Sequence, residues 1–235
     1  MLSLVLPTYN EAENLPRVLP ELAEILKDLP YEIIVVDDDS PDHTWRVAER
    51  LSGTDLRVRV IRRVGRRGLS TAVMEGFAVA RGDVLAAADA DGQHDLRILP
   101  EMYRIVKEKS GIAVGSRYVP GGSVGEWDER RHVLSRVATR LSIALCRVKV
   151  RDPMSGFFAV DRKVFEAIAP TLHPKGFKIL FDILLRVPAR TPAAEVPYTF
   201  RTRTAGASKL SLRVQWQFLA SLLGAAVRRI FTRSV

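Results

Sequence analysis

The residues best suited to chemistry lie between Asp89 and His94, where the chain reads Asp-Ala-Asp-Gly-Gln-His. Asp89 and Asp91 are two positions apart, so on an extended run their side chains point the same way and can converge on one point. Carboxylate oxygens, and the amide oxygen of Gln93, are hard ligands that suit Mg²⁺ or Mn²⁺. The apolar run 84–88 before them indicates a buried strand. Ligands of open α/β sheets bind beyond such strand ends, which predicts a metal site, although a turn rich in Asp and Gly is the alternative.

Alternating strand and helix patterns surround this segment and must position it. Strands are expected over 2–7, 31–36, 56–61, 84–88 and 112–115. Helices are expected over 15–26, 44–51 and 70–80, with Asn10 capping the first and Glu13 three residues later. Short loops join strand to helix, which predicts an α/β fold with a mainly parallel sheet. The carboxyl ends of parallel strands share one edge, so the polar residues after the first strands should face a common crevice.

Composition limits the class of protein. The chain has 235 residues and is 47% hydrophobic, enough for one large domain or two small ones with a sizeable core. Cys146 is the single cysteine, so no internal disulfide can form and a reducing compartment is expected. Met1 leads into a strand-like run without a signal peptide, and no apolar run approaches the ~18 residues that span a bilayer. The net charge of +9 favours an anionic partner: nucleic acid, a phosphorylated substrate or a membrane surface.

Phosphate is also suggested by the basic loop 62–68, although neither the dinucleotide-binding nor the P-loop glycine signature occurs. An ordered set of motifs over roughly residues 2–212 resembles glycosyltransferase family 2, which has the GT-A fold, and within it the dolichyl- and polyprenyl-phosphate mannose synthases. The motifs are 6–11, 36–42, 89–94, 115–117, 152–158, 176–178, 196–203 and 206–210. Two positions depart from the family pattern without removing a ligand: Gly92, where an apolar residue is commoner, and Asp39, where Gly or Asn is commoner.

The resemblance implies a role for each motif residue. The nucleotide base and ribose would be held by Pro7, Tyr9, Glu11, Val36 and Asp38. The metal and the donor diphosphate would be surrounded by Asp89, Ala90, Asp91 and Gln93, of which Asp89, Asp91 and Gln93 would be metal ligands. The donor site would also include Lys178, Arg203 and Lys209, and the acceptor phosphate would be bound by Arg117, Arg131 and Ser135. Asp89, Asp91 and Arg117 would be the catalytic residues. Plainer alternatives exist: Tyr9 as a half-buried aromatic, Asp38 as a turn residue, Arg117 as a solvated charge.

The implied reaction is inverting transfer of mannose from GDP-mannose to dolichyl or polyprenyl phosphate, with Mg²⁺ or Mn²⁺ as cofactor. Cleavage of the C1–O bond leaves negative charge on the nucleoside diphosphate, which a divalent metal and fixed Arg or Lys side chains neutralise. The acceptor phosphate is already anionic and needs little general-base help, so His94 is expected to be a polar neighbour of the site. A related transferase that uses UDP-glucose or a soluble acceptor would share the donor site and remains an alternative.

Two basic amphipathic segments predict contact with a membrane surface. One helix, 132–147, lies in an acceptor-binding insertion, 119–150, of a catalytic domain over 1–211. The other, 212–231, lies in a C-terminal interface region, 212–235. Such helices bind membrane interfaces, although packing on the catalytic core is an equal alternative for either one. We therefore expect a peripheral protein on the cytoplasmic face of a membrane. Some members carry transmembrane helices after the catalytic domain, so the anchor here would come from a longer chain or a separate membrane-anchoring subunit.

The basic charge also suggests a nucleic-acid-binding protein. That function needs basic residues with interleaved aromatics along one groove, whereas the basic residues here cluster near phosphate loops and apolar helices. No nucleic acid is therefore expected as a partner. A noncatalytic family member is disfavoured by the intact Asp89, Asp91 and Arg203.

Overall fold

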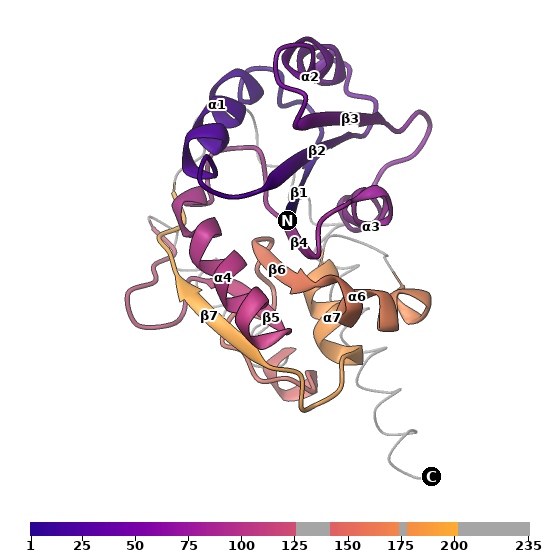
Figure 1. Cartoon of the computed structure of the whole chain (residues 1–235). Coiled ribbons are helices and arrows are strands. Elements are labelled where there is room, and N and C mark those ends of the chain that lie inside the picture. The colour runs from indigo at the N-terminus through magenta and orange to yellow at the C-terminus, as the bar shows by residue number, and fades with distance from the viewer. Residues whose placement is uncertain (126–141, 174–177, 202–235) are drawn as a thin grey trace.

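The computed structural model describes residues 1–125, 142–173 and 178–201, and its strands form one sheet flanked by helices (Figure 1). The strands are β1 Leu2–Thr8, β2 Tyr31–Asp37, β3 Val58–Arg62, β4 Val84–Ala87, β5 Ile112–Ser116, β6 Phe158–Asp161 and β7 Ala193–Pro197. The helices are α1 Leu15–Ile25, α2 Thr44–Ser52, α3 Leu69–Val79, α4 Leu99–Lys109, α6 Arg162–Ile168 and α7 Ile179–Arg186, with 3₁₀ turns η1 Leu96–Ile98 and η2 Ala169–Thr171. The predicted α/β fold is confirmed.

Strand direction gathers the polar loops at one edge of the sheet. The strand order is β3-β2-β1-β4-β6-β5-β7. β1 is parallel to β2 and β4, β2 to β3, and β5 to β7, whereas β6 is antiparallel to both β4 and β5. All described strands except β6 therefore run the same way, which makes the sheet mainly parallel, as predicted. The loops after β1, β2, β4, β5 and β7 and the loop before β6 consequently meet at the same edge.

Two apolar clusters fill the two faces of the sheet. In β1, Val5 faces α3, α6 and α7, and its neighbours Leu4 and Leu6 face α1 and α4, as the two-residue period of a strand requires. Figure 1 shows these two groups of helices on opposite sides. Helix α3 approaches closely at Gly76, where an added Cβ would lie 2.6 Å from Val5 Cγ1. Both faces are buried, so the sheet edge is the place left for a ligand.

Two local predictions need correction. Asn10 does not cap the first helix, because α1 begins at Leu15 with Asn14 in the cap position. Asn10 instead lies in the loop with φ of 57°, and its N–H donates to Ser40 Oγ at 3.0 Å. The third strand begins at Val58 and not at Leu56, because the Leu56 side chain is 95% exposed in the preceding turn.

The predicted amphipathic helices fall mostly outside the described residues. Residues 142–145 are helical, and Leu145 and Cys146 pack against the core beside α7, so this end of the 132–147 segment contacts the catalytic core. Segment 212–231 lies outside the described residues. Within the described part of the chain, no helix is both long enough and apolar enough to cross a membrane.

Candidate active site

Hydrogen bonds connect the loop after β2 to the end of β1 and the loop that follows it. Asp37 is fully buried and accepts hydrogen bonds from Thr8 Oγ1 at 2.9 Å, Ser40 N at 2.9 Å and Ser40 Oγ at 2.6 Å. The first aspartate of the 36–42 motif, Asp37, therefore stabilises the loop through these hydrogen bonds. Asp39 has φ of 55°, a left-handed conformation that Gly and Asn adopt more readily than most residues. That conformation explains why Gly or Asn is commoner there.

The second aspartate, Asp38, is buried but incompletely bonded. Its Oδ2 accepts from the Gly68 N–H at 2.7 Å. Its Oδ1 lies 3.1 Å from Arg63 Nη1, within ion-pair distance but without the angle of a hydrogen bond. Burial raises the pKa of Asp38, against the opposing effect of the Gly68 N–H and the Arg63 guanidinium. Oδ1 of this buried carboxylate therefore has an ion-pair partner, Arg63, but no hydrogen bond from a described residue.

The other predicted base and ribose residues differ in accessibility. Tyr9 is half-buried, and the Arg67 guanidinium lies over its ring, 4.5 Å from the centroid. Glu11 is buried, and its carboxylate accepts from Asn14 Nδ2 at 2.6 Å at the start of α1. Pro7 is half-buried at the end of β1, whereas Val36 is fully buried in the core under α3 and supports the floor of the site.

The loop after β4 presents the predicted metal ligands. The Asp89 side chain is about one third exposed, at 34%, whereas Asp91 is buried and its Oδ1 accepts the Gln93 N–H at 3.0 Å. Gly92 takes φ of 76° in this turn, and Ala90 is buried. Gln93 Nε2 donates to the Arg201 carbonyl at 3.1 Å, so Oε1 is the atom of that side chain that could act as the predicted metal ligand.

The donor set at this loop fits a divalent ion with few protein ligands. Among the described residues there is no cluster of three or more acidic, His or Cys side chains that could hold a metal by itself. Mg²⁺ is commonly held by one or two carboxylates together with substrate phosphates, and Asp89 and Asp91 match that pattern. Gly156 lies beside Asp89, since a Cβ added there would be in van der Waals contact with Asp89 Oδ2, at 3.5 Å.

His94 lies beside Asp89, as the sequence predicted, and is buried among aromatic rings. Its Nδ1 accepts the Asp89 N–H at 3.0 Å, and its Nε2 lies 3.8 Å from Asp89 Oδ2. The imidazole stacks on Phe157 at 5.1 Å and meets the edges of Tyr198 and Phe200. Burial lowers the pKa of His94, so the neutral ring with its proton on Nε2 fits these contacts.

Arg117 follows β5 and is paired with a carboxylate that no residue-level prediction named. Its Nε and Nη2 donate to the two oxygens of Asp152 at 2.8 and 2.9 Å. Asp152 is fully buried, and the Glu195 carboxylate of β7 accepts its N–H at 3.0 Å. The carboxylate raises the pKa of Arg117 despite burial. The signal for Asp152 was its place in a family motif, but its partner is 35 residues away in the sequence.

Lys178 is brought to the same region from the segment before α7. Its Nζ donates to the Met154 carbonyl at 2.9 Å. Burial, and then the positive charge of Arg117, lower the pKa of Lys178 to about 8. Asp152 and Asp89 oppose that shift, so Lys178 lies within electrostatic reach of one predicted metal ligand, Asp89. The structure thus brings Lys178, Arg117 and Asp89 together.

The remaining predicted site residues, Arg131, Ser135, Arg203 and Lys209, lie outside the described residues. The described chain nevertheless leads toward the site at its end, because the Arg201 N–H donates to the Gln93 carbonyl at 2.9 Å.

The match to known proteins agrees with this arrangement of loops. Residues 3–169 match glycosyl transferase family 2. The chain belongs to glycosyl transferase family 2. It is 44% identical over 92% of its length to a dolichol-phosphate mannosyltransferase of Pyrococcus furiosus, and it spans 61% of that protein. It is 35% identical over 94% of its length to the dolichol-phosphate mannosyltransferase of Saccharomyces cerevisiae, and it spans 85% of that protein.

Solved structures of other sugar transferases share the fold of this chain. A mannosyltransferase from Pyrobaculum calidifontis, solved with GDP-Man and Mn²⁺, superposes with a TM-score of 0.66 at 19% identity, over 97% of this chain and 64% of that one. That likeness concerns the fold. The match to family 2 therefore rests on sequence, and the geometry at the sheet edge is independent of it.

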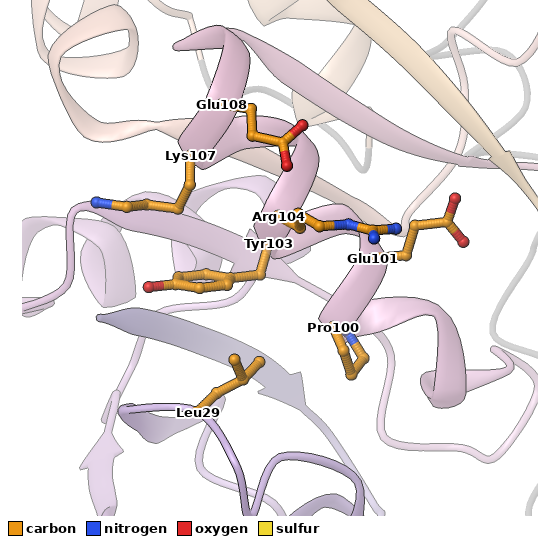
Figure 2. A pocket seen from close by; sticks show the side chains of 7 residues that line it. All are labelled: Leu29, Pro100, Glu101, Tyr103, Arg104, Lys107 and Glu108. Carbon is orange, nitrogen blue, oxygen red and sulfur yellow. The ribbon is translucent and has the colours of Figure 1, made fainter.

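A surface groove elsewhere on this family-2 chain does not belong to the site. It has a volume of about 640 Å³ and is lined by Leu29, Pro100, Glu101, Tyr103, Arg104, Lys107 and Glu108 (Figure 2). Lys107 pairs with Asp83, which precedes β4, and Leu29 precedes β2. The groove therefore lies toward the amino ends of these strands, and none of the predicted site residues lines it.

Proposed function

We propose that this protein transfers mannose from GDP-mannose to a polyprenyl or dolichyl phosphate. The observation that carries the proposal is the joint placement, at one sheet edge, of two carboxylates after β4 and two cations, Arg117 and Lys178, beside them. That set suits the transfer of a group between two phosphorylated molecules. The choice of mannose and of a lipid acceptor is supported by the names of the relatives from Pyrococcus and Saccharomyces.

The donor half of the reaction uses the loops after β1, β2 and β4. Tyr9, Glu11 and Asp38 bind the nucleoside, and the carboxylates of Asp89 and Asp91, with Gln93 Oε1, hold a divalent cation, Mg²⁺ or Mn²⁺. When bound, the cation neutralises charge that develops on the leaving diphosphate. His94 fixes the main chain of Asp89 through the hydrogen bond to its Nδ1.

The acceptor half of the reaction depends on cations. Arg117, held flat by Asp152, presents its guanidinium edge to the acceptor phosphate, and Arg131 and Ser135 extend that contact. Lys178, together with Arg203 and Lys209, adds positive charge near the donor phosphates. The acceptor oxygen is anionic at neutral pH, so a single displacement at C1 inverts the anomeric centre without a side-chain base.

We further propose that the catalytic domain over 1–211 works at the cytoplasmic face of a membrane, with 212–231 and the part of 132–147 that precedes its core-packed end in the interface. A long isoprenoid chain leaves the bilayer at a cost of about 0.8 kcal/mol per CH₂, so the enzyme must come to the lipid. Liposome co-sedimentation should be strong with anionic vesicles and weaker at high salt. Removal of residues 212–235 should weaken it further. If the truncated protein sediments as well as the full chain and keeps its activity on long acceptors, segment 212–231 packs on the core and its part in the membrane proposal is wrong.

The activity is tested with a panel of nucleotide sugars and two acceptors. Radiolabelled GDP-mannose and UDP-glucose are each offered with a short polyprenyl phosphate and with a soluble phosphorylated acceptor such as 3-phosphoglycerate. We expect label in the lipid phase from GDP-mannose alone. Label in the aqueous product would favour the soluble-acceptor alternative, and transfer from UDP-glucose would replace the donor.

A further inference from the structure

The basic loop 62–68 contains one arginine that differs from its neighbours. Arg62 pairs with Asp39 at 2.6 Å, Arg63 is buried against Asp38 and Thr71, and Arg66 forms two 3.0 Å hydrogen bonds with Glu75. Arg67 is exposed and makes no ion pair or hydrogen bond with any residue that the structure describes. Its guanidinium lies instead over the Tyr9 ring, 4.5 Å from the centroid.

Strand order places this arginine at the end of the site away from the metal ligands. Tyr9 follows β1 and Asp38 follows β2, while Asp89 and Asp91 follow β4 on the other side of β1. Adjacent strands are about 4.8 Å apart, so the ends of β2 and β4 are separated by about 10 Å. That is the scale of a nucleoside, which puts Arg67 beside the base and not beside the diphosphate.

Arg67 and Asp38 offer complementary hydrogen-bonding groups around the Tyr9 ring. Asp38 Oδ1 is buried beside Arg63 Nη1 at 3.1 Å and receives no hydrogen bond from a described residue, so an acceptor position on it is unfilled. Arg67 presents a planar set of N–H donors. Guanine displays the O6 and N7 acceptors on one edge, where a bidentate arginine is the commonest specific contact, and N–H donors at N1 and N2 on the adjacent edge. Uracil has no N7 and cannot make the same two-pronged contact.

We propose that Arg67 is the residue that selects guanine in the nucleotide donor. As the base stacks on Tyr9, the guanidinium moves from the ring face to the base edge and donates to O6 and N7, while Asp38 Oδ1 accepts from N1–H or N2–H. The inference rests on the proposed function, which takes a GDP-sugar as donor, and it adds a specificity residue from a loop to which the resemblance assigned no nucleotide contact.

The test measures the affinities of GDP and UDP by calorimetry at a fixed excess of Mg²⁺. The two ligands carry the same ribose and diphosphate, so the ratio of their dissociation constants reports the contribution of the base. The variants are Arg67→Ala, Arg67→Lys, which keeps charge but not the two-pronged geometry, and Arg66→Ala as a matched control whose guanidinium is already bound to Glu75. Arg67 and Arg66 are both exposed, so the variants should fold, and thermal melts verify this.

We expect Arg67→Ala to weaken GDP binding by about 10-fold to 100-fold and UDP binding by at most about threefold. Arg67→Lys should recover little of the preference, and Arg66→Ala should leave both affinities unchanged. Equal losses for the two nucleotides, no loss for either, or a wild type without preference for GDP would each overturn the inference. Transfer by the wild type is scored separately: mannose transfer with an unchanged GDP/UDP ratio in Arg67→Ala defeats the base-selecting role alone, whereas absence of transfer from GDP-mannose defeats the proposed function.

Discussion

The two sides of the site are built in different ways. On the donor side, which we define as the loops after β1, β2 and β4, short polar motifs hold each other through hydrogen bonds between adjacent parallel strands, as in Thr8–Asp37 and Asn10–Ser40. On the acceptor side, which we define by position as Arg117, Asp152 and the neighbouring donor-phosphate cation Lys178, charged groups meet from segments far apart in the sequence. The contacts of the donor side therefore lie within and between short sequence motifs. The contacts of the acceptor side form only when the antiparallel strand β6 places the loop before it at the sheet edge.

The largest effect should come from the donor side. Asp91→Ala removes a carboxylate that we assign to the metal, and the lost stabilisation of several kcal/mol corresponds to a drop in kcat of about 10³-fold or more. The rate of radiolabel transfer measures this, with circular dichroism to verify the fold. Asp55→Ala is the control, because that carboxylate pairs with Arg57 in the turn before β3. EDTA should stop the wild type, and Mg²⁺ or Mn²⁺ should restore it; full activity in excess EDTA rules out the metal.

On the acceptor side the largest effect should be on stability. Asp152→Ala leaves the Arg117 guanidinium buried without its carboxylate, which should lower the free energy of unfolding by about 3–5 kcal/mol. Asp55→Ala breaks a more exposed pair and should cost about 0–1 kcal/mol. Urea denaturation of both variants gives the comparison. Equal destabilisation by the two substitutions would show that the Arg117–Asp152 pair does not organise the acceptor side.

His94 accepts a hydrogen bond from the Asp89 N–H on the donor side and stacks on Phe157 just before β6. Substitutions there can separate the effect of its hydrogen bond to Asp89 from the effect of its ring stacking. His94→Phe keeps a ring on Phe157 but leaves the Asp89 N–H without its acceptor, so kcat/KM should fall about tenfold or more through misplacement of Asp89. His94→Asn keeps an acceptor near the position of Nδ1 but loses the stacking, so stability should fall by about 1–2 kcal/mol with a smaller loss of activity. If both variants show the same balance of activity and stability, the hydrogen bond to Asp89 has no separate role.

Sequence periodicity predicted β1 to β5 and the first three helices, because buried strands and helices leave regular apolar patterns, but it did not predict α4, α6, α7, β6 or β7. It placed β1, β2 and β4 within a residue or so, and it gathered their polar ends at one edge. It failed where local signals compete: Asn10 resembles a helix cap, but the first turn of α1 forms further on, around Pro16, whose missing N–H suits that position.

Site residues whose contacts lie close in the sequence were predicted, whereas contacts between distant segments were not. Asp89 and Asp91 are visible as a pair, but the use of Asp37 as a loop anchor is not, because Asp37, Asp38 and Asp39 look alike in sequence. The basic loop 62–68 suggested phosphate, yet the carboxylates of Asp39, Asp38 and Glu75 neutralise Arg62, Arg63 and Arg66. Neither the partner of Arg117 nor the lowered pKa of Lys178 follows from sequence spacing, because each arises from tertiary burial.

The smallest effect we expect is a pH dependence on the acceptor side. Lys178, with a pKa of about 8, carries its charge at pH 7 and loses it as the pH rises through 8. If its charge attracts the donor phosphates, the KM for the nucleotide sugar should rise by up to about tenfold between pH 7 and 9.5. The kcat should change less, because a bound anion raises the pKa of the ammonium group. Lys178→Arg keeps its charge over this range, so its KM should be flat with pH.

The free energy of unfolding provides a second test of the Lys178 titration, because stability and substrate affinity should change in opposite directions as the pH rises. The pKa of Lys178 is about 8 in the folded protein and 10.5 without the fold, so between these values the unfolded chain binds more protons. The contribution of Lys178 to the free energy of unfolding therefore increases as the pH rises through that window, while substrate affinity decreases. Thermal melts of the wild type and Lys178→Arg at pH 7 and 9.5 should show a relative gain for the wild type at the higher pH. A rise in KM that Lys178→Arg shares, or a relative loss of wild-type stability, would assign the pH effect to another group.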